Sequence, residues 1–325
     1  MHEAVRSLLA GAPVEVETWD SFWDHLNDRA SARDAVTLLE TLRDEPVAHA
    51  TVVALIESLD ARREHPAPQA AVNIVGSGGG PATFNLSTAA AILAAAVGVP
   101  VVKSGSRGYS SRYGSVDLLK LLRIPLARSQ DELAAQLGAR GIAFAGPFAY
   151  PGELALLAKR VFPVDWRTVG AFVNRVGPFL AAVPADAQLT GVSDPALLGL
   201  YTALPLRRRL WLVNNDAGVD ELVAFAPNTV RGDGRSWTWG PVAPGALGDL
   251  ARGDDVIAHF TALLGGNGSP AALDSIALNA AAMAVLGGVE PDFDAALAET
   301  RAALRAGAAA ALLDELRACV ASSRS

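Results

Sequence analysis

The chain has 325 residues, a formal net charge of −7 and one cysteine, Cys319. This length allows one large domain with a smaller one, and the single cysteine excludes an intramolecular disulfide. The acidic balance disfavours nucleic acid as a partner, and the one dense basic run, residues 207–209, is interpreted as a solvated helix end or a local ion-pairing site. No apolar stretch is long enough to span a membrane and the sequence opens with no secretory signal, so we expect a cytoplasmic protein with no membrane contact.

The predicted elements begin with helices and continue with alternating strands and helices. Apolar residues recur at helical spacing over 31–45 and 48–63, and residues 64–69 are predicted to form a linker. Beyond the linker, short apolar runs such as 72–75 and 209–215 alternate with helical segments, and the alanine-rich tail is predicted to form one closing helix. The alternation predicts parallel strands joined by crossover helices, an α/β fold.

A glycine-rich loop follows the first predicted strand, in the sequence VNIVGSGGGPATFNLST that ends at residue 88. Because it precedes a helix, whose first N–H groups and dipole attract anions, it can bind phosphate. It can also serve only to pack the strand against the helix, and both interpretations stay open. Asn85, Ser87 and Thr88 can cap that helix or bind phosphate or Mg²⁺. The loop lacks the lysine of a P-loop and the spacing of a dinucleotide fingerprint.

A second loop, within residues 101–117, combines cations with hydroxyls. It contains Lys103, Arg107, Ser110, Ser111 and Arg112, a set that suits a polyphosphate because lysine is a point charge and arginine a planar donor. Only three of the 27 basic residues of the chain are lysines, so a lysine in this loop indicates a need for a compact ammonium group. The alternative is a solvated turn.

A third segment, LVNNDAGVDELVAF, places Asp220 and Glu221 soon after a predicted strand. Paired carboxylates suit Mg²⁺, which prefers oxygen ligands, although such a pair alone is more typical of a surface loop. The five histidines are scattered outside these loops, so we expect no histidine general base.

In order along the chain, NIVGSGGGPATFNLST, KSGSRGYSSRYGSVDLL and LVNNDAGVDEL resemble the motifs of the anthranilate phosphoribosyltransferase family, within glycosyltransferase family 3. The resemblance implies a small all-helical domain hinged to a large α/β domain with a mostly parallel central sheet. The helical domain would comprise residues 1–66 and about 153–183, and the α/β domain residues 70–152 and 184–325. It also implies a homodimer formed through the helical domain.

The resemblance further implies transfer of a phosphoribosyl group from 5-phosphoribosyl pyrophosphate (PRPP) to an acceptor nitrogen, with release of pyrophosphate and with Mg²⁺ as cofactor. Its metal ligands would be Ser87, Asp220 and Glu221. No residue is assigned a catalytic role. The residues that would bind PRPP are Gly76, Ser77, Gly78, Gly79, Asn85, Ser87, Thr88, Lys103, Arg107 and Ser111. The residues that would face the acceptor are Ser104, Ser106, Tyr109, Tyr150 and Arg167.

Departures from the family pattern fall mostly on the acceptor side. Gly80 replaces an acidic residue of the first loop, and Pro81 lies where a glycine is usual. Ser104 replaces a histidine, and the arginine that pairs with the anthranilate carboxylate has Arg167 only as its nearest candidate. We therefore expect an acceptor other than anthranilate, either another aromatic amine or a nitrogen heterocycle. The alternatives are a true anthranilate enzyme of tryptophan biosynthesis and a catalytically silent ligand-binding homologue.

Overall fold

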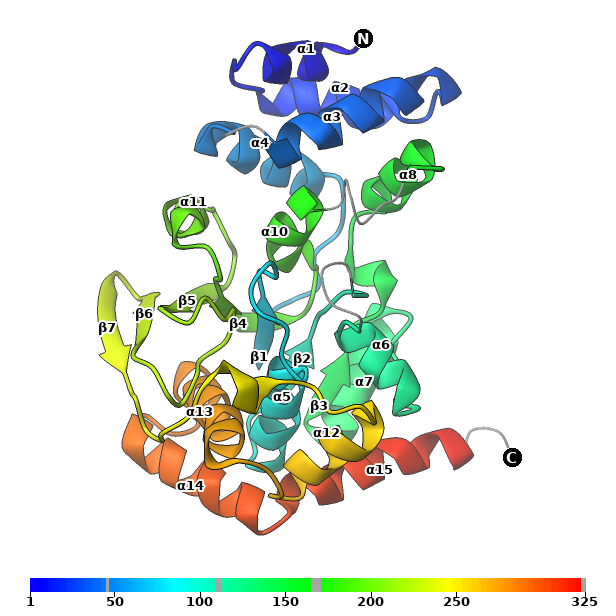
Figure 1. Ribbon diagram of the computed structural model, residues 1–325. Coiled ribbons are helices and arrows are strands. Elements are labelled where there is room, and N and C mark those ends of the chain that lie inside the picture. Colours follow the sequence, from blue (N-terminus) through cyan, green and yellow to red (C-terminus); the bar gives the residue numbers. More distant parts are fainter. Residues whose placement is uncertain (45–46, 109–112, 165–170, 323–325) are drawn as a thin grey trace. The chain divides into compact units, whose positions relative to one another are not determined.

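The computed structural model describes residues 1–44, 47–108, 113–164 and 171–322 (Figure 1). Its contacts divide the chain into two units. The helical unit comprises Met1–His65, Pro147–Ala182 and Ala196–Leu206, and the α/β unit comprises Pro66–Gly146, Val183–Pro195 and Arg207–Ser325. The predicted boundaries did not assign Ala196–Leu206 to the helical part; this segment joins it because the short helix α11 packs against α4.

The helical unit is built on buried aromatic side chains. Trp19 and Trp23 stack with their rings 5.6 Å apart, and their indole N–H groups donate to the Thr51 carbonyl and the Ser58 hydroxyl at 3.1 and 3.0 Å. These bonds satisfy the buried indoles and fix α2 against α4. The helices of this unit are α1 (Glu3–Leu9), α2 (Val16–His25), η1 (Arg29–Ser31), α3 (Ala32–Asp44), α4 (His49–Ala61), η2 (Pro147–Ala149), α8 (Gly152–Val161), α10 (Ala171–Leu180) and α11 (Leu198–Thr202).

The α/β unit contains a seven-stranded sheet in the order β3-β2-β1-β4-β5-β6-β7. The first five strands in this order are parallel, and β6 and β7 continue the sheet as an antiparallel hairpin. This confirms the predicted α/β fold with a mostly parallel sheet. The strands are β1 (Gln69–Gly76), β2 (Val101–Lys103), β3 (Ile142–Phe144), β4 (Ala185–Gly191), β5 (Arg209–Asn215), β6 (Asn228–Gly232) and β7 (Arg235–Trp239).

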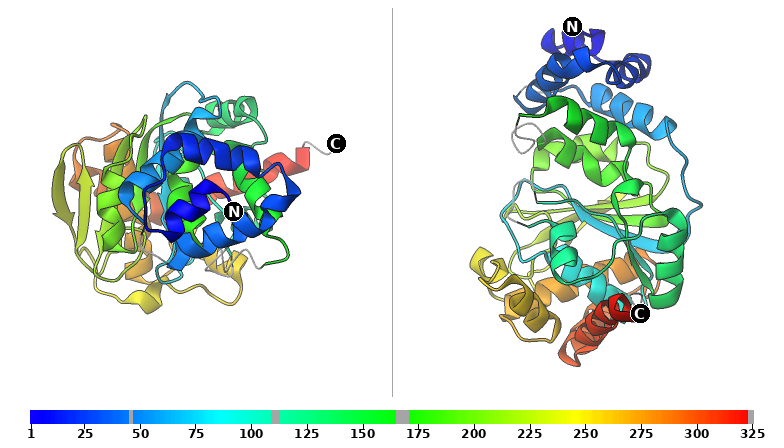
Figure 2. Two further views of the ribbon diagram at one scale, coloured as in Figure 1. Left: turned by 90° about the horizontal axis from the view of Figure 1, so that it is seen from above. Right: turned by 90° about the vertical axis from the view of Figure 1, so that its right-hand side faces the viewer.

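Helices cover one face of this sheet, and Figures 1 and 2 show α5, α13, α14 and α15 on the same side of it. Helix α5 is buried on almost every side, so its run of alanines allows the sheet and α13 to approach it closely. The helices of this unit are α5 (Leu86–Ala96), α6 (Ser115–Leu121), α7 (Gln130–Arg140), η4 (Leu247–Leu250), α12 (Val256–Leu264), α13 (Pro270–Leu286), α14 (Phe293–Arg305) and α15 (Ala308–Ser322). The short helix η3 (Pro195–Leu197) spans the boundary between the two units.

Two features of the α/β unit differ from the sequence predictions. The alanine-rich tail forms two helices, α14 and α15, because Gly307 adopts a positive φ of 77° between them. The β6–β7 hairpin was not predicted, although its Asp233-Gly234 turn, with φ of 51° and 74°, is a recognised hairpin signal.

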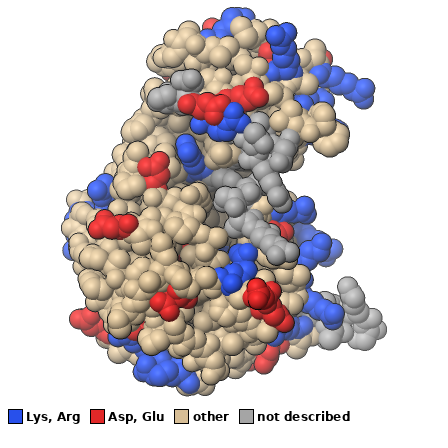
Figure 3. Space-filling model, in the orientation of Figure 1, with Lys and Arg blue, Asp and Glu red and all other residues tan. Residues whose placement is uncertain are grey.

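Charged side chains are dispersed over the face drawn in Figure 3, where Lys and Arg lie among Asp and Glu. Within the basic run 207–209, Arg209 pairs with Asp233 at 3.1 Å, as expected for a local ion-pairing site. Among the described residues, no helix is long and apolar enough to cross a membrane.

Candidate active site

The three predicted loops converge at the carboxyl ends of neighbouring parallel strands. The glycine loop follows β1, Lys103 is the last residue of β2, and the acidic pair follows β5. Strand β4, which lies between β1 and β5, ends at Gly191. The chain crosses from β1 to β2 on one side and from β4 to β5 on the other, so the loops meet at a topological switch point, where α/β proteins bind their ligands.

Glycine is needed in the first loop and at the end of β4 for two different physical reasons. A Cβ atom on Gly76 would lie 2.0 Å from Asp220 Oδ2, and one on Gly191 would lie 1.7 Å from the Asp220 carbonyl oxygen. These two positions are glycine because the acidic loop passes directly against the ends of β1 and β4. Gly78 and Gly79 instead adopt positive φ values of 69° and 83°, which turn the chain. The loop therefore both turns and allows a close approach.

Gly80 occupies a position with no room for the acidic residue expected from the family pattern. A Cβ atom there would lie 2.4 Å from the Gly218 carbonyl oxygen and 3.0 Å from Ser193 Cβ. Ser193, which follows β4, also holds the loop: its hydroxyl donates to the Gly78 carbonyl at 2.6 Å. In this chain the loop is packed too tightly for a side chain at position 80.

The acidic pair bonds to the glycine loop and to the start of α5. The Gly78 N–H donates to Asp220 Oδ2 at 2.8 Å, and the Ser87 N–H donates to Glu221 Oε1 at 3.1 Å. Lys103 completes the cluster, since its ammonium donates to the Ile74 carbonyl at 2.9 Å and to the Ser87 hydroxyl at 3.3 Å. The structure thus brings together Ser87, Lys103, Asp220 and Glu221, four of the residues expected to bind PRPP or the metal.

Burial sets the electrostatics of this cluster. Lys103 is only 3% exposed, and desolvation lowers its pKa to about 8, opposed by the nearby carboxylates. Desolvation raises the pKa of Asp220. It also raises the pKa of Glu221 to about 8, with the adjacent Asp220 charge as a further cause. The half-buried Asp220 and the buried Glu221 carboxyl groups face one ammonium, so an added cation would favour their charged forms.

The side chains of this cluster fit Mg²⁺ as a partial set of ligands. Within the described residues no group of three or more His, Cys, Asp and Glu side chains could hold a metal ion. The pair Asp220 and Glu221 with the Ser87 hydroxyl would therefore supply part of an octahedral shell. Phosphate oxygens of a substrate and waters would complete it, which is the usual mode of Mg²⁺ binding.

The other predicted phosphate ligands, Arg107, Ser111 and Ser77, are not all part of this cluster. Arg107 is exposed in the second loop. Gly108 and Gly114 of this loop are held near each other, because their N–H groups both donate to Asp117 Oδ2, at 2.7 and 3.0 Å. Ser111 lies outside the described residues. Ser77 is buried and its hydroxyl accepts a hydrogen bond from the Ser193 N–H.

Asn85 and Thr88 lie at the start of α5, where the sequence predicted a cap or phosphate ligands. Asn85, in the left-handed conformation, makes no side-chain cap; it donates to the Tyr113 carbonyl at 3.4 Å instead. Thr88 is fully buried, and its hydroxyl has no hydrogen-bond partner among the described residues.

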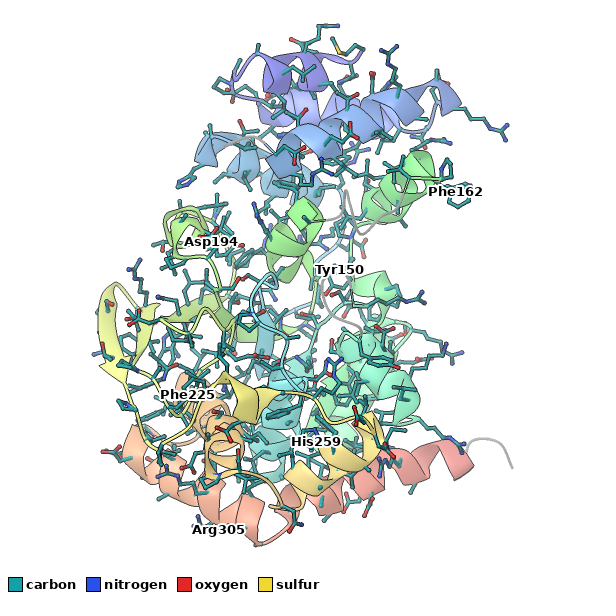
Figure 4. The ribbon with its side chains drawn as sticks, in the orientation of Figure 1. Tyr150, Phe162, Asp194, Phe225, His259 and Arg305 are labelled. Carbon is teal, nitrogen blue, oxygen red and sulfur yellow. The ribbon has the colours of Figure 1, made fainter. Side chains whose placement is uncertain are left out.

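Three of the five predicted acceptor residues lie in the part of the chain that the structure describes: Ser104 and Ser106 in the α/β unit and Tyr150 in the helical unit. Ser104 is buried, and its N–H and hydroxyl both donate to Asn73 Oδ1, at 3.0 and 3.2 Å. Ser106 is exposed in the second loop. Tyr150, labelled in Figure 4, follows η2 in the helical unit and is half-buried. Tyr109 and Arg167 lie outside the described residues.

Sequence reasoning missed the residues that support the acidic loop. Asn215 donates to the Glu221 carbonyl at 2.8 Å. From α13, Asn279 accepts from the Leu222 N–H at 3.1 Å and donates to the Leu222 carbonyl at 2.8 Å, as a neighbouring strand would. The sequence signal for Asn279 is an asparagine in a buried alanine-rich helix, because a buried amide side chain needs hydrogen-bond partners.

Replacing Asn279 by Leu is expected to lower the free energy of unfolding by about 2–4 kcal/mol, because both Leu222 backbone groups lose their partner while buried. Urea denaturation measures this cost. Asn267→Leu, in an exposed turn, is the control and is expected to have little effect. An Asn279→Leu protein as stable as the Asn267→Leu protein would contradict the assigned role.

Comparison with known proteins identifies the class to which this site belongs. The family model described as "Glycosyl transferase family, a/b domain" matches residues 68–238, which include all three loops. The chain is a glycosyltransferase, so the prediction that it is an enzyme is confirmed.

Relatives define the family more closely. An anthranilate phosphoribosyltransferase of Methylorubrum extorquens (strain PA1) is 32% identical, with 94% of this chain and 95% of that protein covered. The one from Moorella thermoacetica is 36% identical, with 77% and 76% covered. The structure of the Thermus thermophilus enzyme matches with a TM-score of 0.81 and 29% identity, over 98% of this chain and 99% of that one. The chain belongs to the anthranilate phosphoribosyltransferase family.

A yeast anthranilate phosphoribosyltransferase in complex with PRPP and Mg shares the fold, with a TM-score of 0.70 and 19% identity over 94% of this chain and 98% of that one. PRPP and Mg²⁺ are thus ligands of a protein with this fold.

Proposed function

We propose that this chain transfers the phosphoribosyl group of PRPP to anthranilate, with Mg²⁺ as cofactor and pyrophosphate as the second product. The observation that carries the proposal is the joined cluster at the strand ends, in which Asp220 bonds to the glycine loop and Glu221 bonds to the start of α5 beside Lys103. The names of the relatives support anthranilate better than the acceptor expected from the sequence departures.

The chemistry requires charge stabilisation more than a protein nucleophile. The bond between ribose C1 and the pyrophosphate oxygen breaks as the bond from C1 to the acceptor nitrogen forms, leaving the electron pair on pyrophosphate. The proton that the acceptor nitrogen loses passes to water or to the released pyrophosphate. Bound Mg²⁺, held by Asp220, Glu221 and Ser87, would neutralise part of the phosphate charge. The N–H groups at the start of α5 and the Lys103 ammonium favour negative charge at the same edge of the sheet.

A second acceptor class is favoured by one observation. Ser104, where the family pattern has a histidine, is buried and its polar groups bond to Asn73, so this position offers no imidazole to an acceptor. An aromatic amine or nitrogen heterocycle without a carboxylate is the corresponding candidate.

An acceptor panel distinguishes the two candidates. We expect anthranilate to give a kcat/KM at least about tenfold above that of aniline and simple heterocyclic amines, a difference of about 1.4 kcal/mol in transition-state binding. A carboxylate-free acceptor that outperforms anthranilate would reverse the assignment, and PRPP binding without turnover of any acceptor would favour a silent homologue. The homodimer through the helical unit also stays a proposal, which sedimentation equilibrium tests.

A further inference from the structure

Arg252 lies in the segment between η4 and α12, far along the chain from either phosphate-binding loop. Its Nη2 atom donates to the Thr83 carbonyl at 3.2 Å and to Asn85 Oδ1 at 3.4 Å, both in the glycine loop. The same atom donates to the Tyr113 carbonyl of the second loop at 3.2 Å. One guanidinium group therefore bonds to both loops.

Further contacts strengthen this junction. The Arg252 guanidinium carbon lies 5.4 Å from the centre of the Tyr113 ring, within the range of a cation–π interaction. Asn85 also donates to the Tyr113 carbonyl at 3.4 Å, so the two loops are bonded directly as well as through Arg252. Tyr113 therefore contacts the guanidinium through its ring and Asn85 through its carbonyl.

The segment that carries Arg252 is itself held in place. The Phe84 N–H donates to the Leu250 carbonyl at 3.0 Å, and the Gly253 N–H donates to Nδ1 of His259 at 2.9 Å. His259, labelled in Figure 4, lies on α12 and meets the Phe84 ring edge-on at 6.0 Å. The segment that contains Arg252 therefore packs against the glycine loop, and this packing fixes the position of Arg252.

Both loops continue from this junction to predicted phosphate ligands. On one side, the Thr83 hydroxyl donates to Glu221 Oε2 at 3.4 Å, and Asn85 precedes α5 and Ser87. On the other side, Tyr113 precedes Gly114, which shares Asp117 with Gly108, the neighbour of Arg107. The position of Arg252 can therefore affect both halves of the site.

We propose that Arg252 is a positioning residue that holds the glycine loop and the second loop in one arrangement, so that their phosphate-binding groups are set before PRPP binds. This inference rests on the proposed function. The Nη2 atom makes all three hydrogen bonds, and the planar guanidinium also lies over the Tyr113 ring. A lysine ammonium could supply the donors but not the planar stacking. Arranging the loops in advance removes an ordering cost from ligand binding.

Steady-state kinetics of Arg252→Lys and Arg252→Met test the effect on PRPP. Arg252→Met is expected to raise KM for PRPP at least about tenfold and Arg252→Lys to raise it less, and both are expected to change KM for the acceptor less than about twofold. The matched control is Arg301→Met, which removes a bidentate pair with Asp274 between α14 and α13. It is expected to lower the unfolding midpoint without changing KM for PRPP. An unchanged KM in Arg252→Met, or an equal rise in Arg301→Met, would overturn the proposal.

Amide hydrogen exchange without ligand tests the coupling itself. In Arg252→Met, peptides from the glycine loop and from the second loop are expected to exchange faster together, and faster exchange in one loop only would overturn the proposal. Asn85→Gly, which keeps the positive φ, and Arg252→Met are expected to be non-additive in PRPP affinity. If the wild-type protein neither binds nor consumes PRPP, the proposed function fails, while the exchange measurement still decides the role of Arg252.

Discussion

Replacing Asp220 by Asn together with Glu221 by Gln is expected to weaken Mg²⁺-dependent PRPP binding by a factor on the order of 100 or more, about 3 kcal/mol. The amides keep the shape of the two side chains and can still accept from the Gly78 and Ser87 N–H groups. They remove the negative charges that would hold the cation. Isothermal titration calorimetry with PRPP, with and without Mg²⁺, measures the effect.

The same double variant is expected to fold, with a stability close to that of the wild-type protein. Burial raises the pKa of both carboxyl groups, so neutral amides relieve the cost of their charged forms, but the variant also removes the charges that favour the buried Lys103 ammonium. Asp216→Asn, an exposed acid in the same loop, is the control and should change neither stability nor affinity. Unchanged PRPP affinity in a folded double variant would refute the metal assignment.

Gly80→Asp is expected to lower PRPP affinity more than about tenfold and to cost about 1–3 kcal/mol of folding free energy, even though it restores the acid of the family pattern. The new Cβ would collide with the Gly218 carbonyl oxygen at 2.4 Å, which is backbone and cannot rotate away. Relief of that collision requires a shift of the segment that leads to Asp220.

Calorimetry and thermal unfolding of Gly80→Asp check this result. Gly248→Asp is the matched control, because nothing lies within 4 Å of its added Cβ. It should leave PRPP affinity unchanged. Tighter PRPP binding by Gly80→Asp would show that the loop can rearrange around an acid, so that packing does not exclude a side chain at position 80.

The sequence predicted the parts of this site that local patterns encode. Apolar runs followed by glycine, lysine or acidic residues located the three loops at strand ends, and α/β topology brings such ends together. The sequence could not predict why Gly76 is glycine, because Asp220, the residue that excludes a side chain there, lies far along the chain. The same holds for Arg252, whose partners lie in loops that only the fold brings within reach.

The acceptor side shows a different limit. The place of Ser104 in the motif predicts a residue that faces the acceptor, and in the structure its polar groups bond to Asn73, whose amide donates in turn to Gln188 at 2.9 Å. A position within a motif does not tell whether a hydroxyl faces a ligand or a neighbouring strand. Burial decides this, and burial depends on the whole sheet.

The most direct test of the proposed function is pyrophosphate release measured together with anthranilate consumption, in a reaction that contains PRPP and Mg²⁺. We predict one pyrophosphate released for each anthranilate consumed, and loss of both signals when EDTA removes the metal. Pyrophosphate release that does not depend on Mg²⁺, or no consumption of anthranilate while PRPP is bound, would contradict the account.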